Sequence, residues 1–184
     1  MHTMAGHHIQ LFGKVPLSER QHIVLNAAVF QLAWLACVLG GSWVAVAVTA
    51  AVVTLHLNAV TDTRREALFL VQCAIAGFVC DLALIQIGVM DTGYPLPPVW
   101  LTSLWVLFGT TVGYALRFFH GRLALCVGGG LFFAPLSYYG GARLANVNLF
   151  EPVWAALLII GLVWAVIFPL LIHLYTVNKL RATR

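Results

Sequence analysis

Charged side chains are scarce in this sequence. Its 184 residues include only six Asp and Glu and ten Lys and Arg, so that 9% of the chain is charged and 61% is apolar. The mean hydropathy is +0.94. So little charge excludes an ordinary soluble domain and a disordered chain, whereas repeated apolar runs of about 20 residues indicate helices that cross a membrane. We therefore expect an all-α integral membrane protein.

Long polar segments are also missing, which leaves no room for a soluble catalytic module. The spacing of apolar runs and turn residues predicts a single bundle of six transmembrane helices. The expected spans are residues 22–39, 42–60, 63–89, 98–118, 123–139 and 151–176. Residues 1–21 would then form a cytoplasmic or interfacial segment, residues 22–176 the six-helix domain, and residues 177–184 a basic cytoplasmic tail.

Local sequence signals support these boundaries. Gly40 to Ser42 predict a tight turn, the prolines between 95 and 98 end the third span, and Gly140–Gly141 are expected to end the fifth. Three pairs have the spacing of a helix capping box and predict helix starts. They are Ser18 with Gln21, Thr63 with Glu66, and Asn148 with Glu151.

The few basic residues are distributed unevenly. With the N-terminus inside, nine of the ten lie on the cytoplasmic side and only Arg143 lies outside. This asymmetry predicts that both termini are cytoplasmic, in a bacterial inner (plasma) membrane. In short loops such residues contact anionic lipids, so we expect membrane lipids and no nucleic acid as partners. The nine are Lys14, Arg20, Arg64, Arg65, Arg117, Arg122, Lys179, Arg181 and Arg184.

Motifs that would name a reaction are absent. The sequence has no nucleotide-binding glycine pattern, no G-x-S-x-G elbow and no HExxH, so catalytic residues and any cofactor stay unknown from the sequence. The four cysteines lack the spacing of a zinc site and are interpreted as small buried apolar residues. His22, His56 and His173 fall near the cytoplasmic face, where solvated rings are a simpler interpretation than a metal site.

One acid lies deep in a predicted span. Asp81 shares a helix face with the small residues Cys73, Gly77 and Gly88, so it should face neighbouring helices and not lipid. An ionised carboxylate at this depth is unfavourable by at least about 2.5 kcal/mol, and it needs a partner or a proton. Two interpretations stay open: a carboxylate that binds a proton, an ion or a ligand, and a structural Asp that fixes the helix register.

Small residues mark two further spans. In the fourth span, Trp105 shares a stripe with Gly109 and Gly113, which is typical of close helix packing. The fifth span contains Gly128–Gly129–Gly130 and Pro135, which weaken a helix. They predict either a broken helix that lines a cavity or, the simpler alternative, a thin, kinked helix that packs tightly.

Several runs together resemble a known family. They are residues 26–34 (NAAVFQLAW), Asp81, residues 98–101 (PVWL) with Trp105, and residues 130–138 with their PLSY ending. Over about residues 25–154 the chain resembles a family of six-span bacterial inner-membrane proteins that is catalogued only as a domain of unknown function. The resemblance implies the architecture and no activity. It loosely suggests a link to enzymes that modify membrane fatty acids.

Three functions remain as hypotheses. The first is a small membrane protein, or a subunit of a larger complex, that binds or transports a lipid-like or small apolar ligand. The second is a membrane enzyme or enzyme partner in lipid modification, with the histidines as its polar site. The third is a structural protein without a ligand, assembled with a protein partner or a second copy of the chain. We favour the first, with Asp81, Trp105, Gly129, Ser137 and Gln31 as ligand-binding residues.

Overall fold

The computed structural model describes residues 18–181 and is all-α apart from one small pair of strands. Four of its five α-helices, all except α3, are long and apolar enough to cross a membrane. The helices are α1 (Glu19–Ala59), α2 (Thr63–Gln86), α3 (Val99–Val112), α4 (Leu123–Ala145) and α5 (Val153–Arg181), with a short 3-10 helix, η1 (Arg117–Phe119). The antiparallel strands β1 (Met90–Asp91) and β2 (Asn148–Leu149) join the α2–α3 and α4–α5 connections.

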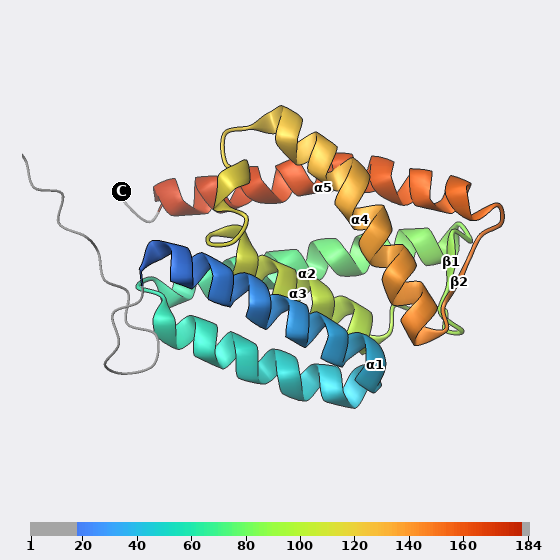
Figure 1. Ribbon diagram of the computed structural model, residues 1–184, viewed down its shortest axis with the longest axis horizontal. Coiled ribbons are helices and arrows are strands. Elements are labelled where there is room, and N and C mark those ends of the chain that lie inside the picture. Colours follow the sequence, from blue (N-terminus) through green and yellow to red (C-terminus); the bar gives the residue numbers. More distant parts are fainter. Residues whose placement is uncertain (1–17, 182–184) are drawn as a thin grey trace, which may run out of the picture.

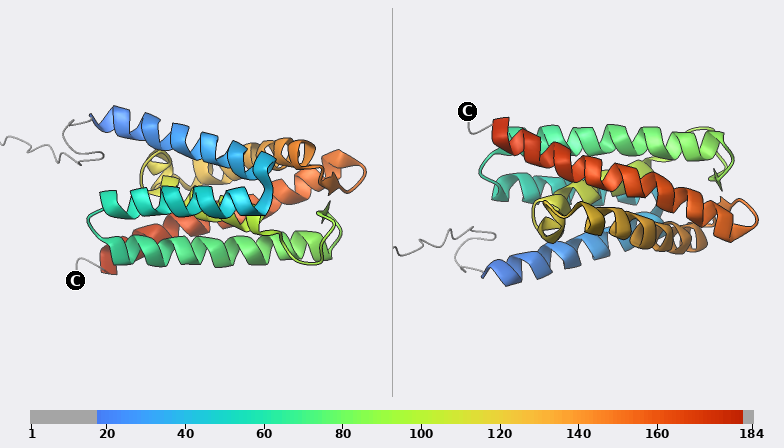
Figure 2. Two further views of the ribbon diagram at one scale, coloured as in Figure 1. Left: turned by 90° about the horizontal axis from the view of Figure 1, so that it is seen from below. Right: turned by 90° about the horizontal axis from the view of Figure 1, so that it is seen from above.

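Helix α1 reverses direction at Gly41. The backbone there has φ 68° and ψ −167°, a left-handed conformation that favours glycine. The two halves of α1 then run side by side in opposite directions (Figure 2). The turn predicted at Gly40 to Ser42 is therefore confirmed. The capping box of Ser18 and Gln21 is also present at the start of the helix.

Two predicted capping boxes are wrong. Helix α2 is capped by Asp62, whose side chain accepts a hydrogen bond from the Arg65 N–H, while Glu66 turns into the protein. Asn148 lies in strand β2, and α5 begins only at Val153. In both places a tertiary interaction holds the residue that the spacing assigned to a helix end.

Helices α3 and α4 differ from their predicted lengths. Helix α3 ends at Val112, six residues before the expected end, and turns and η1 follow it. Helix α4 is continuous through its glycines and Pro135 and passes Gly140–Gly141 without a break. It ends at Ala145, capped by Asn146 with φ 54°. Contacts with neighbouring helices therefore stabilise α4 where its glycines and Pro135 lower its intrinsic helix propensity.

The bundle consists of two tightly packed helix pairs with α2 beside them. Helix α1 packs mainly on α3, α4 packs mainly on α5, and α2 contacts α3 and α5. The starts of α1, α2 and α4 and the end of α5 lie at one end of the bundle, and the Gly41 turn and the two strands lie at the other (Figure 1). We call the first the basic end. The described basic residues at this end are Arg20, Arg64, Arg65, Arg117, Arg122, Lys179 and Arg181. Arg143 lies near the other end of the bundle, in the last turn of α4. Lys14 and Arg184 lie outside the described residues.

Candidate functional site

Asp81 of α2 is fully buried and contacts side chains of α3 and α4. Its Oδ1 atom accepts a hydrogen bond from the Tyr138 hydroxyl at 2.5 Å, and its Oδ2 atom accepts one from the Trp105 indole N–H at 2.8 Å. Among the described residues, no Lys, Arg or His forms an ion pair with it. Two uncharged donors from α3 and α4 thus hold this carboxylate, which ties both helices to α2.

Trp105 is fixed in position on several sides. Its ring stacks on Trp164 of α5 with the centroids 4.5 Å apart and the planes 17° from parallel. On the α2 side it lies against Gly77, where an added Cβ atom would approach its Cγ atom to 2.0 Å. Gly77 is therefore required for the close approach of this indole. The small-residue face predicted for α2 is confirmed at Cys73, Gly77 and Asp81, whereas Gly88 lies beyond the helix end and is exposed.

A cavity of about 430 Å³ lies on the other side of Trp105 and Tyr138, between the α1–α3 pair and the α4–α5 pair. Its walls are almost entirely apolar and rich in aromatic rings. Four of the six tryptophans of the chain line it: Trp34, Trp100, Trp105 and Trp164. We call it the aromatic cavity. The volume is within the range of about 300–1,000 Å³ that is usual for small-molecule sites.

The aromatic cavity is long and opens on the outer surface of the bundle. Along α4 its lining extends from Gly129 to Ala142, which at 1.5 Å per residue is about 20 Å. Phe133 and Ser137 line it and are also exposed, with Phe133 63% exposed, so they mark the opening. This surface is otherwise covered with exposed apolar side chains, such as Phe132 and Leu136 on the same helix. The cavity is therefore open at the side of the bundle.

The structure brings together three of the five expected ligand-binding residues. Trp105, Gly129 and Ser137 line the aromatic cavity. Asp81 does not line it but hydrogen-bonds to two residues that do. Gln31 is exposed and is not part of the lining.

The glycines of α4 serve tight packing within an unbroken helix. At Gly130, an added Cβ atom would meet the Trp164 carbonyl oxygen at 2.4 Å, so α4 and α5 approach backbone to backbone. Gly129 lies against Phe119 and Phe168 on the cavity wall. The prediction of a broken fifth span is thus wrong, and the alternative of a helix made thin for packing is correct. The same small residues still leave room for the cavity.

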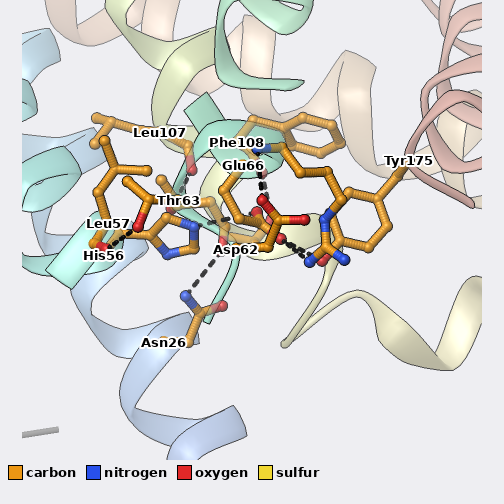
Figure 3. A network of polar contacts seen from close by, with 12 residues as sticks. Asn26, His56, Leu57, Asp62, Thr63, Glu66, Leu107, Phe108 and Tyr175 are labelled. Carbon is orange, nitrogen blue, oxygen red and sulfur yellow. Dashed lines mark hydrogen bonds and ion pairs between the residues drawn. The ribbon is translucent and has the colours of Figure 1, made fainter. Parts of the chain in front are cut away.

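A second buried acid, Glu66, lies near the basic end, and its side chain is 1% exposed (Figure 3). Its Oε1 atom accepts hydrogen bonds from the Arg65 guanidinium at 2.8 Å and the Tyr175 hydroxyl at 2.7 Å. Its Oε2 atom lies 3.4 Å from Nε2 of His56. Unlike Asp81, this carboxylate is paired with a permanent cation. We refer to these four residues as the Glu66 cluster.

The sequence contains a signal for Glu66 that the capping-box interpretation hid. Glu66 precedes Cys73 by seven residues and therefore lies on the same helix face as Cys73, Gly77 and Asp81. Tyr138 and Trp164, by contrast, have no such signal, because their roles depend on which helices become neighbours.

The predicted histidine layer is only partly brought together. His22 and His56 line a second, smaller cavity, whereas His173 is exposed on α5 and lies apart from it. Within residues 18–181, no three His, Cys, Asp or Glu side chains are close enough to hold a metal ion. All four cysteines are free; Cys37, Cys73 and Cys126 are buried and Cys80 is partly buried.

Comparison with known proteins gives one finding. The chain matches no curated protein and no solved structure. A family model described as "Protein of unknown function (DUF2878)" matches residues 23–170, which is most of the chain and agrees with the resemblance inferred from the sequence. The chain therefore belongs to the DUF2878 family.

Proposed function

We propose that this protein binds a single-chain, lipid-like molecule in the aromatic cavity and admits it sideways from the bilayer. The observation that carries this proposal is the cavity itself, a long apolar space with its opening on an apolar surface and with Asp81 fixing its inner wall.

The energetics of an empty cavity favour an apolar occupant. An unfilled apolar space leaves the side chains that line it without van der Waals contacts on one side. The almost entirely apolar walls also offer water few hydrogen-bond partners. A hydrocarbon chain would replace the missing contacts.

The shape of the cavity favours one chain over a compact molecule. A volume of about 430 Å³ spread over about 20 Å gives a mean cross-section of about 20 Å². Carbon atoms in contact are about 4 Å apart, so this cross-section suits one extended hydrocarbon chain. A lipid acyl chain spans one leaflet of the hydrocarbon core, which is about 15 Å thick. Its length is therefore similar to the roughly 20 Å over which the cavity extends along α4.

Asp81 acts in this proposal as a positioning residue. Both of its oxygens are engaged by Trp105 and Tyr138, so it holds those two rings in the wall without contacting the ligand. The ring stacked behind Trp105, that of Trp164, extends the same wall to α5.

Native mass spectrometry of the protein extracted from its own membrane tests the proposal. Ala134 lines the cavity, so A134F places a ring in it and obstructs it, whereas A124F places the same side chain on an exposed position of α4 outside the lining. We expect one bound molecule with the mass of a single-chain lipid in the wild type and in A124F, and none in A134F. An adduct that survives in A134F, or a bare chain in all three, would overturn the proposal.

A defined probe gives an independent measurement. Trp43 and Trp154 are 88% and 68% exposed and lie outside the cavity, so in a W43F/W154F background the fluorescence arises from the four cavity tryptophans. Dibromostearic acid should quench this fluorescence saturably, and A134F should abolish the saturable part while A124F keeps it. Quenching that rises linearly in both variants would show only partition into the micelle.

We further propose that the chain crosses a bacterial inner membrane six times, with both termini in the cytoplasm. Each half of α1 contains about 20 residues, enough for a crossing, and α3 is extended by the turns that follow it. The concentration of basic residues at one end supports the orientation.

Single added cysteines test the orientation in intact cells. S42C and D91C report on the Gly41 end, and R64C and R122C report on the basic end; the native cysteines are buried or partly buried. A membrane-impermeant maleimide should label only S42C and D91C until the cells are opened. Labelling of R64C or R122C in intact cells would contradict the orientation.

A further inference from the structure

A second cavity lies at the basic end, between the two halves of α1 and the end of α3. Its volume is about 80 Å³, and it is separate in its lining from the aromatic cavity. We call it the basic-end cavity. At about 30 Å³ per molecule, it has room for two water molecules. Its polar lining residues are His22, Asn26, His56, Thr110 and Tyr114.

The hydrogen bonds of the two histidines leave one ring nitrogen of each without a protein partner. Nδ1 of His22 lies 3.2 Å from the Ser18 carbonyl oxygen, which can only accept, so Nδ1 carries a proton. Nε2 of His22 is buried and has no hydrogen-bond partner in the described part of the chain. In His56, Nε2 faces the Glu66 carboxylate, and Nδ1 forms no hydrogen bond to a described residue.

Water in the basic-end cavity would satisfy these nitrogens. A buried water molecule needs two to four polar partners. Asn26 bonds to the Thr110 carbonyl and to the Ala115 N–H, and it holds α1 against the end of α3. The unpaired nitrogens of His22 and His56, together with the Tyr114 hydroxyl in the lining, are partners for water in this cavity.

We propose that the basic-end cavity holds water that delivers protons to Nδ1 of His56, so that His56 and Glu66 form a proton-binding site reached from the basic end. A solvent proton forms a new N–H bond at Nδ1, while Nε2–H stays directed at Glu66. The side chain of His56 is only 8% exposed, and water is thus the link between its ring and bulk solvent. The proposal is independent of the ligand in the aromatic cavity.

Charged and titratable groups surround this site. Nε2 of His56 lies 3.4 Å from Oε2 of Glu66, and the Arg65 guanidinium lies 2.8 Å from Oε1 of the same carboxylate. The titratable groups that face His56 and Glu66 from the surrounding elements are His22 of α1, Asp62, Arg65 and Cys73 of α2 and its cap, Tyr114 after α3, and Tyr175 of α5, with His120 beside Tyr175.

Hydrogen–deuterium exchange at the imidazole C2 atom, followed by peptide mass spectrometry across pH 5 to 9, tests the proposal. This exchange needs both water and a protonated ring. A59L fills the basic-end cavity, A51L adds the same side chain at an exposed position two helical turns away, and the exposed His173 serves as an internal standard.

We expect His56 in the wild type to exchange at a rate within about tenfold of that of His173, despite its burial. A59L should slow His56 at least about tenfold, since water can no longer reach it, whereas A51L should not. Unchanged exchange in A59L, or wild-type exchange as slow as in A59L, would each overturn the proposal.

Discussion

Helix α2 carries two buried carboxylates that are held in opposite ways. Asp81 and Glu66 lie fifteen residues, or roughly 22 Å, apart on one face. Asp81 accepts hydrogen bonds from two uncharged donors that form the wall of the aromatic cavity. Glu66 accepts from the cation Arg65 and from Tyr175, and faces His56.

The difference teaches what each carboxylate does. Neutralising Asp81 leaves no unbalanced cation behind, so its two oxygens matter more than its charge. Neutralising Glu66 removes the ion-pair partner of the Arg65 guanidinium, whose side chain is only 18% exposed, and leaves Asp62 as its remaining acidic neighbour among the described residues. We therefore expect stability to depend on the negative charge at Glu66, and on the positions of the two hydrogen-bonding oxygens at Asp81.

The largest expected effect is that of E66Q. The amide can still accept from Tyr175, but it removes the negative charge beside Arg65, and the loss of one partner of a buried pair typically destabilises a protein by about 3–5 kcal/mol. Unfolding in mixed micelles with increasing SDS should show this decrease in stability. A loss below about 1 kcal/mol would mean that Arg65 is solvated well enough to do without Glu66.

G77A should have the next largest effect. The added methyl group would overlap the Trp105 ring, which is held by Asp81 and by stacking on Trp164, and such overpacking costs about 1–3 kcal/mol. The same assay on G128A is the control, because an added Cβ atom at Gly128 meets nothing within 4 Å. If both variants were equally stable, Trp105 would not be fixed as described.

D81N should change stability by only about 1 kcal/mol. The Asn carbonyl can accept from Trp105, and its amino group can donate to the Tyr138 oxygen, which accepts as readily as it donates. D81L leaves both donors unpaired and should be clearly less stable than D81N in the same titration. A loss in D81N as large as in E66Q would remove the contrast between the two carboxylates.

The smallest expected effect is that of E19Q. Glu19 also forms an ion pair, with Arg117 at 2.9 Å, but the two side chains are 74% and 66% exposed. Exposed pairs contribute about 0–1 kcal/mol, so E19Q should unfold within that margin of the wild type. A larger loss would show that burial is not what separates Glu66 from an ordinary ion pair.

The sequence predicts the helical elements better than their partners. Apolar runs and glycines locate the Gly41 turn, and helix periodicity places Asp81 on an inward face, because both signals are local. Tyr138 and Trp164 escape prediction because they become important only when α4 and α5 pack beside α2 and α3.

Glu66 shows the limit most clearly. A Thr and a Glu three residues apart have the spacing of a capping box, yet Asp62 caps the helix and frees Glu66 to pair with residues of α1 and α5. Two local patterns, capping and face periodicity, compete for that residue, and long-range contacts decide between them.

The volume of the aromatic cavity has a mechanical consequence. The contraction of a protein on unfolding scales with the internal space that disappears, and the cavity of about 430 Å³ adds to that space when it holds no ligand. Hydrostatic pressure should therefore collapse or unfold the empty protein more readily than the occupied one. A bound hydrocarbon chain occupies that volume, so the pressure at which the protein unfolds would measure the occupancy of the aromatic cavity.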